Sequence, residues 1–228
     1  MLNIVSIKAT DINDAWHQLI LNAPDNARLF TIDKGSYVGQ QRLEFDFINV
    51  QITHPHTRPL EPQMPQHMSS TPPPVADGYI DEYLPYLFTA EIQDNELYTY
   101  GSRLRTPIDQ IQHVIDTYKK HGYRNNQLVM NVGSSIDRTL DDPACLQLID
   151  TRIQDNKLHF YVYFRSWDLW GGFPSNLGGI QILKEFMADE IGVDYGETIA
   201  TSKGAHYYGY CVDLVLQRSM KDKLKREI

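Results

Sequence analysis

Two stretches of the sequence concentrate side chains that could take part in chemistry. The first, DDPACLQLID at 141–150, contains Cys145, which follows a proline turn and precedes an apolar run. An ionised thiol at such a loop-to-strand junction is a nucleophile, whereas a lone cysteine is more often an inert apolar residue. This stretch therefore offers covalent catalysis by a thiolate, with a structural cysteine as the alternative.

The second stretch, FRSWDLWGGFPSNLGG at 164–179, could bind a phosphorylated ligand. Arg165 supplies a planar guanidinium suited to phosphate, and Ser166 supplies a hydroxyl donor. Asn176 can hydrogen-bond the amide edge of a pyrimidine through both its oxygen and its nitrogen, and Asp168 lies between these groups. The alternative is a structural loop with glycine turns, which the residues of this stretch alone would favour.

The hydrophobic periodicity predicts the elements that must position these groups. Strands are predicted at 42–53, 97–100, 128–132, 146–153, 158–164 and 209–217. Helices are predicted at 11–21, 79–88, 107–120 and 177–191, with Asn176 where the last one would begin. The apolar side chains of the third helix that should face inward are Ile108, Ile111, Ile115 and Tyr118.

Two of the predicted strands have unusual patterns. In 42–53 the apolar set changes phase at Phe47–Ile48, which indicates a bulge or bend in a sheet. The run LHFYVYF at 158–164 is almost continuously apolar, which indicates a strand buried on both faces or packed at an interface. Together the elements predict one α+β domain over residues 1–228, with a mixed, bulged sheet flanked by helices.

A proline-rich segment interrupts this pattern at 55–74, where seven of the 12 prolines fall. We expect an extended surface loop there. His54, His56 and His67 lie in or beside it, but no acidic or cysteine side chain follows at ligand spacing, so we expect no metal site. The charged segment KDKLKREI at 221–228 is expected to be solvated.

The composition limits the classes of protein to consider. The 228 residues include 21 basic and 29 acidic side chains, a net charge of −8, which argues against nucleic-acid binding. No apolar run approaches the ~20 residues of a membrane span, and the N-terminus lacks a signal-peptide pattern. Two cysteines cannot form a disulfide scaffold. We expect a soluble, cytoplasmic protein that gathers its arginines at one place if it binds phosphate.

Four motifs in order resemble the folate-dependent thymidylate synthase family, with a match that extends from about Tyr98 to Tyr210. The short length and the stretch at 124–127 are most similar to compact archaeal-type members. The four motifs are Pro143-Ala144-Cys145, Arg165-Ser166-Trp167-Asp168, Gly172-Phe173-Pro174-Ser175-Asn176 and His206-Tyr207-Tyr208.

The resemblance implies a methyltransferase that converts dUMP to dTMP. The donor of carbon and hydride would be 5,10-methylenetetrahydrofolate, or an archaeal pterin analogue, and Cys145 would form a covalent adduct at uracil C6. It also implies a homodimer in which sheet packs against sheet, and the strand at 158–164 would suit that interface.

The resemblance assigns a role to each matching residue. Cys145 would be the nucleophile, and Arg165 would activate it while holding the phosphate together with Ser166. Asn176 would read O4 and N3 of uracil. The remaining matches are Asp168 and Gly172 at the pterin, and His206 and Tyr208 at the deoxyribose 3′-hydroxyl.

Further roles follow from shorter matches. Tyr100 would assist proton removal at C5. Glu82 would organise water and protonate the folate, with Asp81 as its competitor. Lys34 is the candidate for an early phosphate-binding residue, and Arg124 would reach the phosphate of the partner subunit.

The sequence also departs from the family pattern, chiefly on the folate side. Leu146 stands where a histidine is common, and no tryptophan lies between Trp16 and Trp167 to stack on the folate. Two alternatives therefore stay open beside a thymidylate synthase. One is a pyrimidine-nucleotide 5-hydroxymethylase that uses the same cofactor, and the other is a non-catalytic nucleotide-binding relative.

Overall fold

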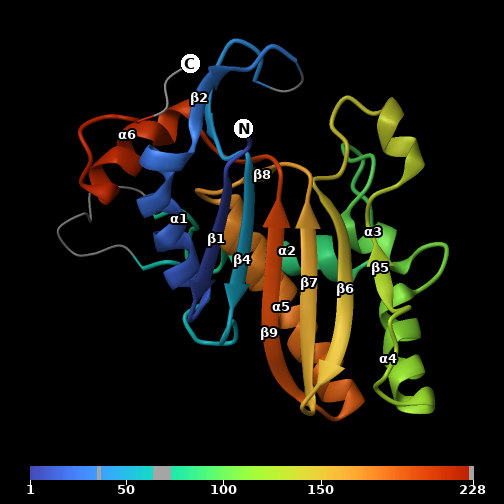
Figure 1. Ribbon diagram of the computed structural model, residues 1–228. Coiled ribbons are helices and arrows are strands. Elements are labelled where there is room, and N and C mark those ends of the chain that lie inside the picture. The colour runs from blue at the N-terminus through green and yellow to red at the C-terminus, as the bar shows by residue number, and fades with distance from the viewer. Residues whose placement is uncertain (35–36, 64–72, 226–228) are drawn as a thin grey trace.

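Two β-sheets and the helices on one face of the larger sheet make up the protein (Figure 1). The computed structural model describes residues 1–34, 37–63 and 73–225. The larger sheet has six strands, in the order β1 (Ile4–Ala9), β4 (Phe47–Ile52), β9 (Asp194–Ser202), β7 (Lys157–Phe164), β6 (Leu146–Gln154) and β5 (Val129–Asn131). The smaller sheet has four, in the order β2 (Arg28–Thr31), β3 (Gln41–Glu44), β10 (Ala205–Tyr208) and β8 (Trp167–Asp168).

The larger sheet is mixed and bulged. Strand β7 pairs in parallel with β9 and antiparallel with β6, and the register shifts between Leu158 and Phe160 on one side and between Leu146 and Leu148 on the other. The predicted α+β class, with a mixed and bulged sheet flanked by helices, is confirmed.

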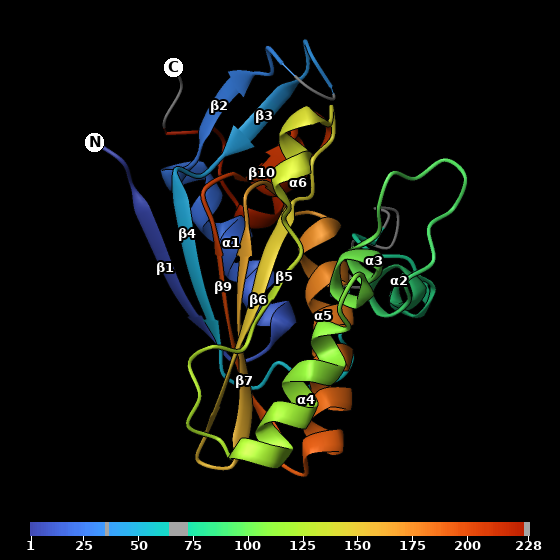
Figure 2. The ribbon, with the colours of Figure 1, turned by 90° about the vertical axis from the view of Figure 1, so that its right-hand side faces the viewer.

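The helices gather on one face of this sheet, where α1 (Ile12–Asn26), α4 (Gln110–His121) and α5 (Gly172–Ile191) lie (Figure 2). The remaining helices are α2 (Tyr79–Phe88), α3 (Tyr100–Arg105), the 3₁₀ turn η2 (Ser135–Thr139) and α6 (Gly209–Ser219). Helix α5 is buried around most of its circumference. Its glycines let α2 come close: a Cβ on Gly179 would lie 2.9 Å from the Tyr83 ring, and one on Gly178 would collide with Ile80.

Four helix predictions and the strands at 128–132, 146–153 and 158–164 are confirmed; the helix at 79–88 has the predicted ends, and the ends of the other elements are shifted. The predicted strand at 97–100 is wrong, because Thr99 caps α3 through a reciprocal pair of hydrogen bonds with Ser102. The predicted strand at 209–217 is also wrong. Its buried residues, Cys211 and Val215, lie four positions apart on one face of α6.

Three finer predictions need correction. Asn176 lies inside α5, which begins four residues earlier, at Gly172. Ile108 is 66% exposed, because α4 begins only after the cap at Asp109. At the end of the chain Leu224 is buried, and the Lys225 amide donates to the Pro24 carbonyl at 2.8 Å, so this part of the tail is packed rather than solvated.

The phase change in 42–53 has a clear structural cause. Strand β3 belongs to the smaller sheet and β4 to the larger one, and the chain bends between them at Phe45–Asp46. The predicted bend is confirmed. The described parts of the proline-rich segment contain no helix or strand, and its Leu60 packs into the core. His67 lies outside the described residues.

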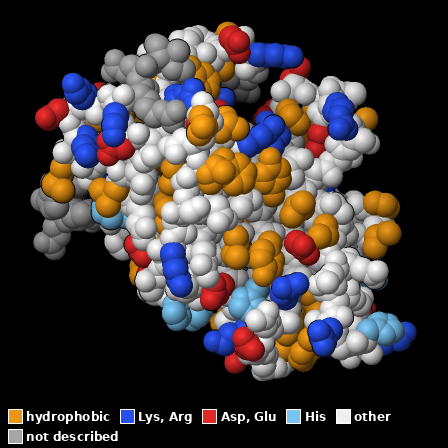
Figure 3. Space-filling model, viewed as in Figure 1, with side chains coloured by type: hydrophobic (Ala, Val, Ile, Leu, Met, Phe, Trp, Pro, Cys, Tyr) orange, Lys and Arg blue, Asp and Glu red, His pale blue; other side chains and the backbone are white. Residues whose placement is uncertain are grey.

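The face of the larger sheet opposite the helices is open. Along β7 one set of side chains is buried, and the alternate set, including Tyr161 and Tyr163, is only half-buried. The prediction that this strand is buried on both faces is therefore wrong within one chain. Apolar side chains gather over the middle of this open face (Figure 3), and half-buried Leu148 and Ile199 lie beside the two tyrosines in the strand register.

Candidate functional site

The end of the larger sheet where β7 finishes and β6 starts brings Cys145 and Arg165 together. Leu146 pairs with Phe164 across the two strands, so the residues flanking that pair lie side by side. The Arg165 amide donates to the Cys145 carbonyl at 2.9 Å. The Arg165 guanidinium donates to the carbonyls of Ala144 and Pro143, and its Nη2 lies 3.8 Å from the Cys145 Sγ.

Opposing effects set the ionisation of this thiol. Burial raises the pKa of Cys145 above its ordinary value, the Arg165 guanidinium lowers it, and the Asp142 carboxylate raises it again. The net shift is upward. Cys145 is therefore mostly a thiol at neutral pH in the ligand-free protein, and Arg165 is the group that favours the thiolate.

A row of tyrosines begins beside Cys145. The Leu146 amide donates to the Tyr100 hydroxyl at 3.3 Å, which fixes this ring next to the cysteine. Tyr86 meets Tyr100 edge-on with ring centroids 5.1 Å apart, and Tyr83 stacks on Tyr86 at 5.6 Å. Burial raises the pKa of all three phenols, so they act as neutral hydroxyl groups at physiological pH.

The row ends at Asn176. The Tyr83 hydroxyl accepts a hydrogen bond from Asn176 Nδ2 at 3.0 Å, and the Trp167 indole N–H donates to Asn176 Oδ1 at 3.0 Å. The Cys145 thiol and the Asn176 amide thus lie at two ends of one connected group of side chains.

Asp168 binds the backbone amides at the start of α5. Its carboxylate accepts from the backbone amides of Trp170 at 3.0 Å, Gly171 at 3.3 Å and Gly172 at 3.0 Å. Burial raises the pKa of Asp168, and these three N–H donors oppose that effect. A hollow of about 450 Å³ opens beside it, lined by Asp168, Gly172, Asn176, Tyr79, Tyr83 and the Pro74–Ala76 segment, among others.

The smaller sheet positions His206 and Tyr208. His206 pairs with Asp168 across β10 and β8, and Tyr208 pairs with Arg42 across β10 and β3. Burial lowers the pKa of His206 to about 4, so the ring is neutral and its Nδ1 donates to the Gly204 carbonyl at 2.8 Å. Its Nε2 is then a buried acceptor with no protein donor among the described residues.

Four of the residues suggested by the resemblance do not join this group directly. Ser166 lies half-buried between Arg165 and Trp167. Glu82 and its competitor Asp81 are both exposed on the first turn of α2. Lys34 is exposed, next to residues that the structure does not describe.

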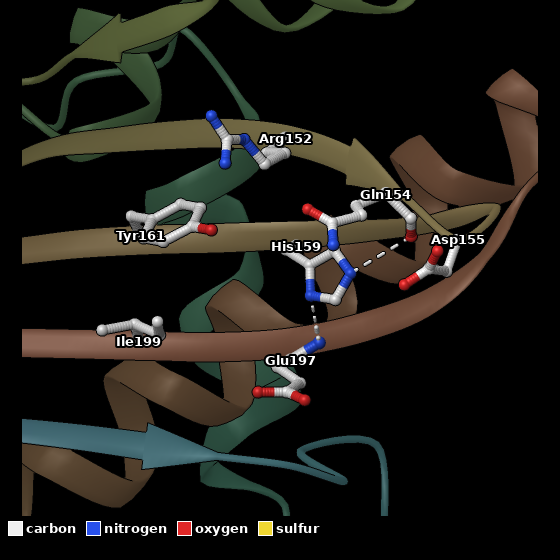
Figure 4. Close-up of a pocket in the computed structure, with 7 residues that line it drawn as sticks. All are labelled: Arg152, Gln154, Asp155, His159, Tyr161, Glu197 and Ile199. Carbon is white, nitrogen blue, oxygen red and sulfur yellow. Dashed lines mark hydrogen bonds between the residues drawn. The ribbon is translucent and has the colours of Figure 1, made fainter. Parts of the chain in front are cut away.

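Arg124 lies far from Cys145 within one chain. It is exposed and lines a hollow with Arg152 and Gln154, at the end of β6 opposite to the one where Cys145 lies. A neighbouring hollow on the open face contains His159, whose Nδ1 accepts from the Glu197 amide at 3.1 Å (Figure 4). Both hollows therefore belong to the open sheet face rather than to the group around Cys145.

Sequence reasoning missed three residues that the structure brings to the group. Tyr83 follows the predicted Glu82 by one position, and on a helix the next residue faces another direction. Trp167 stands inside the motif at 165–168, but the family resemblance assigns it no role. Arg42 pairs with Glu44 at 2.8 Å, and its positive charge acts on His206 and Tyr208; no spacing in the sequence points to it.

The described residues contain neither a metal-binding cluster nor a membrane-spanning helix. Within 1–34, 37–63 and 73–225, no three His, Cys, Asp or Glu side chains are grouped so that they could hold a metal ion. Over the same residues, no helix combines the length and apolar character that a membrane crossing requires.

Comparisons with known proteins give one consistent result. The sequence profile of the family described as thymidylate synthase matches residues 82–227. A Methanosarcina mazei protein named "Putative thymidylate synthase" is 32% identical over 213 residues, which is 92% of each chain. Proteins of the same name from Methanosarcina barkeri and Methanothermobacter thermautotrophicus are 28% and 25% identical over similar lengths.

Proposed function

The chain belongs to the thymidylate synthase family, and on that premise we propose that it catalyses the reductive methylation of dUMP to dTMP. One observation carries the proposal: the Cys145 thiol lies 3.8 Å from the Arg165 guanidinium, at the end of a side-chain group that finishes at Asn176. A thiol that can act as a nucleophile, a guanidinium that can bind phosphate and an amide that can pair with a pyrimidine thus belong to one connected group of side chains.

The first step is attack of the Cys145 thiolate on C6 of the uracil. The free protein holds this residue mostly as a thiol, so the reaction draws on the small thiolate fraction that Arg165 stabilises. Arg165 and Ser166 hold the phosphate, while Asn176 holds N3 and O4 and places C6 near the sulfur. The S–C6 bond turns C5 into an enolate-like nucleophile.

Methylenetetrahydrofolate would supply the one-carbon unit and then a hydride, and it would leave as dihydrofolate. Delivery of the hydride would be accompanied by breakage of the S–C6 bond, which returns Cys145 as a thiolate and frees dTMP. The hollow beside Asp168 suits a pterin, because it combines a carboxylate with aromatic walls and with glycine backbone where side chains would intrude. The C5 proton must also leave. Tyr100, fixed beside Cys145, is the residue we propose to assist its removal, and Glu82 or Asp81 would protonate the folate.

His206 and Tyr208 complete the nucleotide site. The neutral imidazole keeps a buried acceptor at Nε2, which fits the hydroxyl donor of a deoxyribose. Arg42, opposite Tyr208 in the sheet, adds a positive charge on this side and is a better candidate than Lys34 for the early phosphate-binding residue.

The proposal includes a homodimer built on the open sheet face. A two-fold axis through that face would bring the distant end of the partner's sheet, with its Arg124, to the Cys145 end of this chain. Half-buried Tyr161 and Tyr163 give that face the apolar centre that a stable interface needs. The protein would work in the cytoplasm, where thiols are kept reduced.

Product analysis tests the proposal. The purified protein is incubated with dUMP and methylenetetrahydrofolate, and both nucleotide and pterin products are identified. We expect dTMP and dihydrofolate in equal amounts. Hydroxymethyl-dUMP with tetrahydrofolate would make the protein a hydroxymethylase, and tight dUMP binding without any product would make it a non-catalytic relative.

A further inference from the structure

Three separate elements meet at the side-chain amide of Asn176. Trp167 reaches it from β8 and donates its indole N–H to Oδ1, and Tyr83 reaches it from α2 and accepts from Nδ2. Asn176 itself comes from α5. Both ends of the amide are therefore held before any ligand binds.

Trp167 and Tyr83 differ in which end of the Asn176 amide they can bond. An indole N–H only donates, so it is satisfied by an oxygen and repelled by an NH₂ group. A tyrosine hydroxyl can donate or accept, so it can bond either end of an amide. Trp167 alone therefore determines which end of the Asn176 amide is the oxygen.

Trp167 is itself immobile. It is 2% exposed, its ring lies parallel to Phe164 at a centroid distance of 4.0 Å, and Phe173 packs against it at 4.7 Å. Rotation of the indole would break this stacking in a closely packed region. The direction of its N–H bond is thus fixed by the core.

The orientation of the Asn176 amide decides which pyrimidine base it can pair with. Uracil presents an N3–H donor beside the O4 acceptor, whereas cytosine presents an N3 acceptor beside an amino donor. A freely turning amide can match either base by rotating through 180°. After its bonds to Trp167 and Tyr83, the Asn176 amide keeps one oxygen lone pair and one N–H for a ligand, in one fixed order.

We propose that Trp167 is a specificity-determining residue, which locks the Asn176 amide in the orientation that accepts dUMP and rejects dCMP. The inference rests on the proposed function, in that a uracil nucleotide is taken as the substrate. Trp167 acts through Asn176 and is therefore a positioning residue.

The test compares the dissociation constants of dUMP and dCMP, measured by calorimetry on the full chain. Trp167→Phe keeps the stacking on Phe164 and removes the N–H donor. We expect the preference for dUMP to fall about tenfold or more, chiefly because dCMP binds better once the amide can turn over. A preference equal to that of the unmodified protein would overturn the proposal.

Two matched controls separate orientation from stability. Trp16→Phe removes another buried indole N–H, whose 3.0 Å bond goes to the Trp170 carbonyl, and it should leave the dUMP preference unchanged. Tyr83→Phe removes the partner that cannot set the orientation, so both nucleotides should bind more weakly by similar factors. A loss of preference in Tyr83→Phe equal to that in Trp167→Phe would contradict the assignment to Trp167.

Benzothienylalanine at position 167 gives the same test with almost no change of shape, because its ring carries sulfur in place of the N–H. This variant replaces Trp167→Phe in the test if Trp167→Phe does not fold.

The measurements distinguish a failure of the role of Trp167 from a failure of the proposed function. If the unmodified protein binds dUMP with no preference over dCMP, the proposed function falls; if the preference exists and survives both substitutions at position 167, only this inference falls.

Discussion

At the scale of single residues, the proposed reaction depends on a cysteine whose environment opposes its ionisation. Burial keeps the pKa of Cys145 above its ordinary value in spite of Arg165. The thiolate fraction therefore grows only as the pH rises through that raised value. Reactivity should increase with pH above neutrality, and loss of the guanidinium should move the rise to still higher pH.

Alkylation by iodoacetamide measures this directly. In a Cys211→Ser background, the rate at Cys145 should rise with a midpoint above that of a free thiol, about pH 8.5. Arg165→Gln should shift the midpoint further up. Burial raises the pKa of Cys211 to about 12, so this second thiol should react little, and the Cys211→Ser substitution removes its remaining contribution. A midpoint below that of a free thiol would show that the environment of Cys145 is wrongly described.

Asn176 supports a second prediction at this scale. Asn176→Asp replaces the NH₂ end of the side chain with an oxygen that can accept from the amino group of cytosine, while the O–H of a protonated carboxyl can donate to cytosine N3. We expect the nucleotide preference to shift toward dCMP, measured as the ratio of turnover on the two nucleotides. An unchanged ratio would refute the reading role proposed for Asn176.

The motifs predict residues that the structure brings together, such as Cys145 with Arg165 and Asp168 with Asn176, because each motif is a local sequence pattern. They could not predict Tyr83 or Arg42. Tyr83 meets Asn176 only because α2 packs on α5, and Arg42 meets Tyr208 only through the pairing of β3 with β10. Contacts of that kind depend on tertiary packing, which a local pattern does not contain.

At the scale of elements, the close approach of α2 to α5 positions one wall of the site. Gly179→Ala would place a Cβ 2.9 Å from the Tyr83 ring, which cannot swing away because it stacks on Tyr86. Overpacking of this kind costs about 1–3 kcal/mol, partly offset by the better helix propensity of alanine, about 1 kcal/mol. Urea unfolding should show a net loss of stability.

A double substitution provides the control. In a Tyr83→Ala background the clash has no partner, so Gly179→Ala should then be neutral or stabilising. An equal cost in both backgrounds would mean that the glycine serves some purpose other than room for Tyr83.

The elements also show why sequence patterns fail locally. Thr99 and Tyr100 sit in a short segment rich in aromatic residues, which resembles a strand, yet the capping pair with Ser102 starts a helix there. Residues 209–217 are apolar at many positions, and only the burial of Cys211 and Val215 on one face reveals a helix. Short apolar segments fit both the helical and the strand periodicity, and tertiary packing decides which structure forms.

At the scale of the whole molecule, the proposed reaction requires a second copy of the chain. Cys145 and Arg124 lie at opposite ends of the sheet, so an Arg124 that contacts the phosphate of a nucleotide held at Cys145 must come from a partner subunit. Cys145→Ser and Arg124→Ala should each be inactive or strongly impaired. Mixed after brief unfolding and refolding, they should regain about a quarter of the normal activity, since half the dimers are mixed and each has one complete site.

Activity of the mixture is compared with the sum of the two variants measured apart. A mixture no more active than that sum would contradict a shared site, as would full activity of Arg124→Ala alone. Tyr161→Glu on the open face is a useful companion, because it should prevent dimer formation and leave the Cys145 region of each chain intact.

The fate of the hydrogen on C5 of dUMP shows whether Cys145 acts as a covalent catalyst. With dUMP deuterated at C5 and methylenetetrahydrofolate, the unmodified protein should release one deuteron to water for each dTMP formed, because Cys145 makes C5 the nucleophile. Cys145→Ser should bind dUMP nearly as well yet release label more slowly by several orders of magnitude. Covalent catalysis at Cys145 would be contradicted if Cys145→Ser released the label, or formed dTMP, as fast as the unmodified protein.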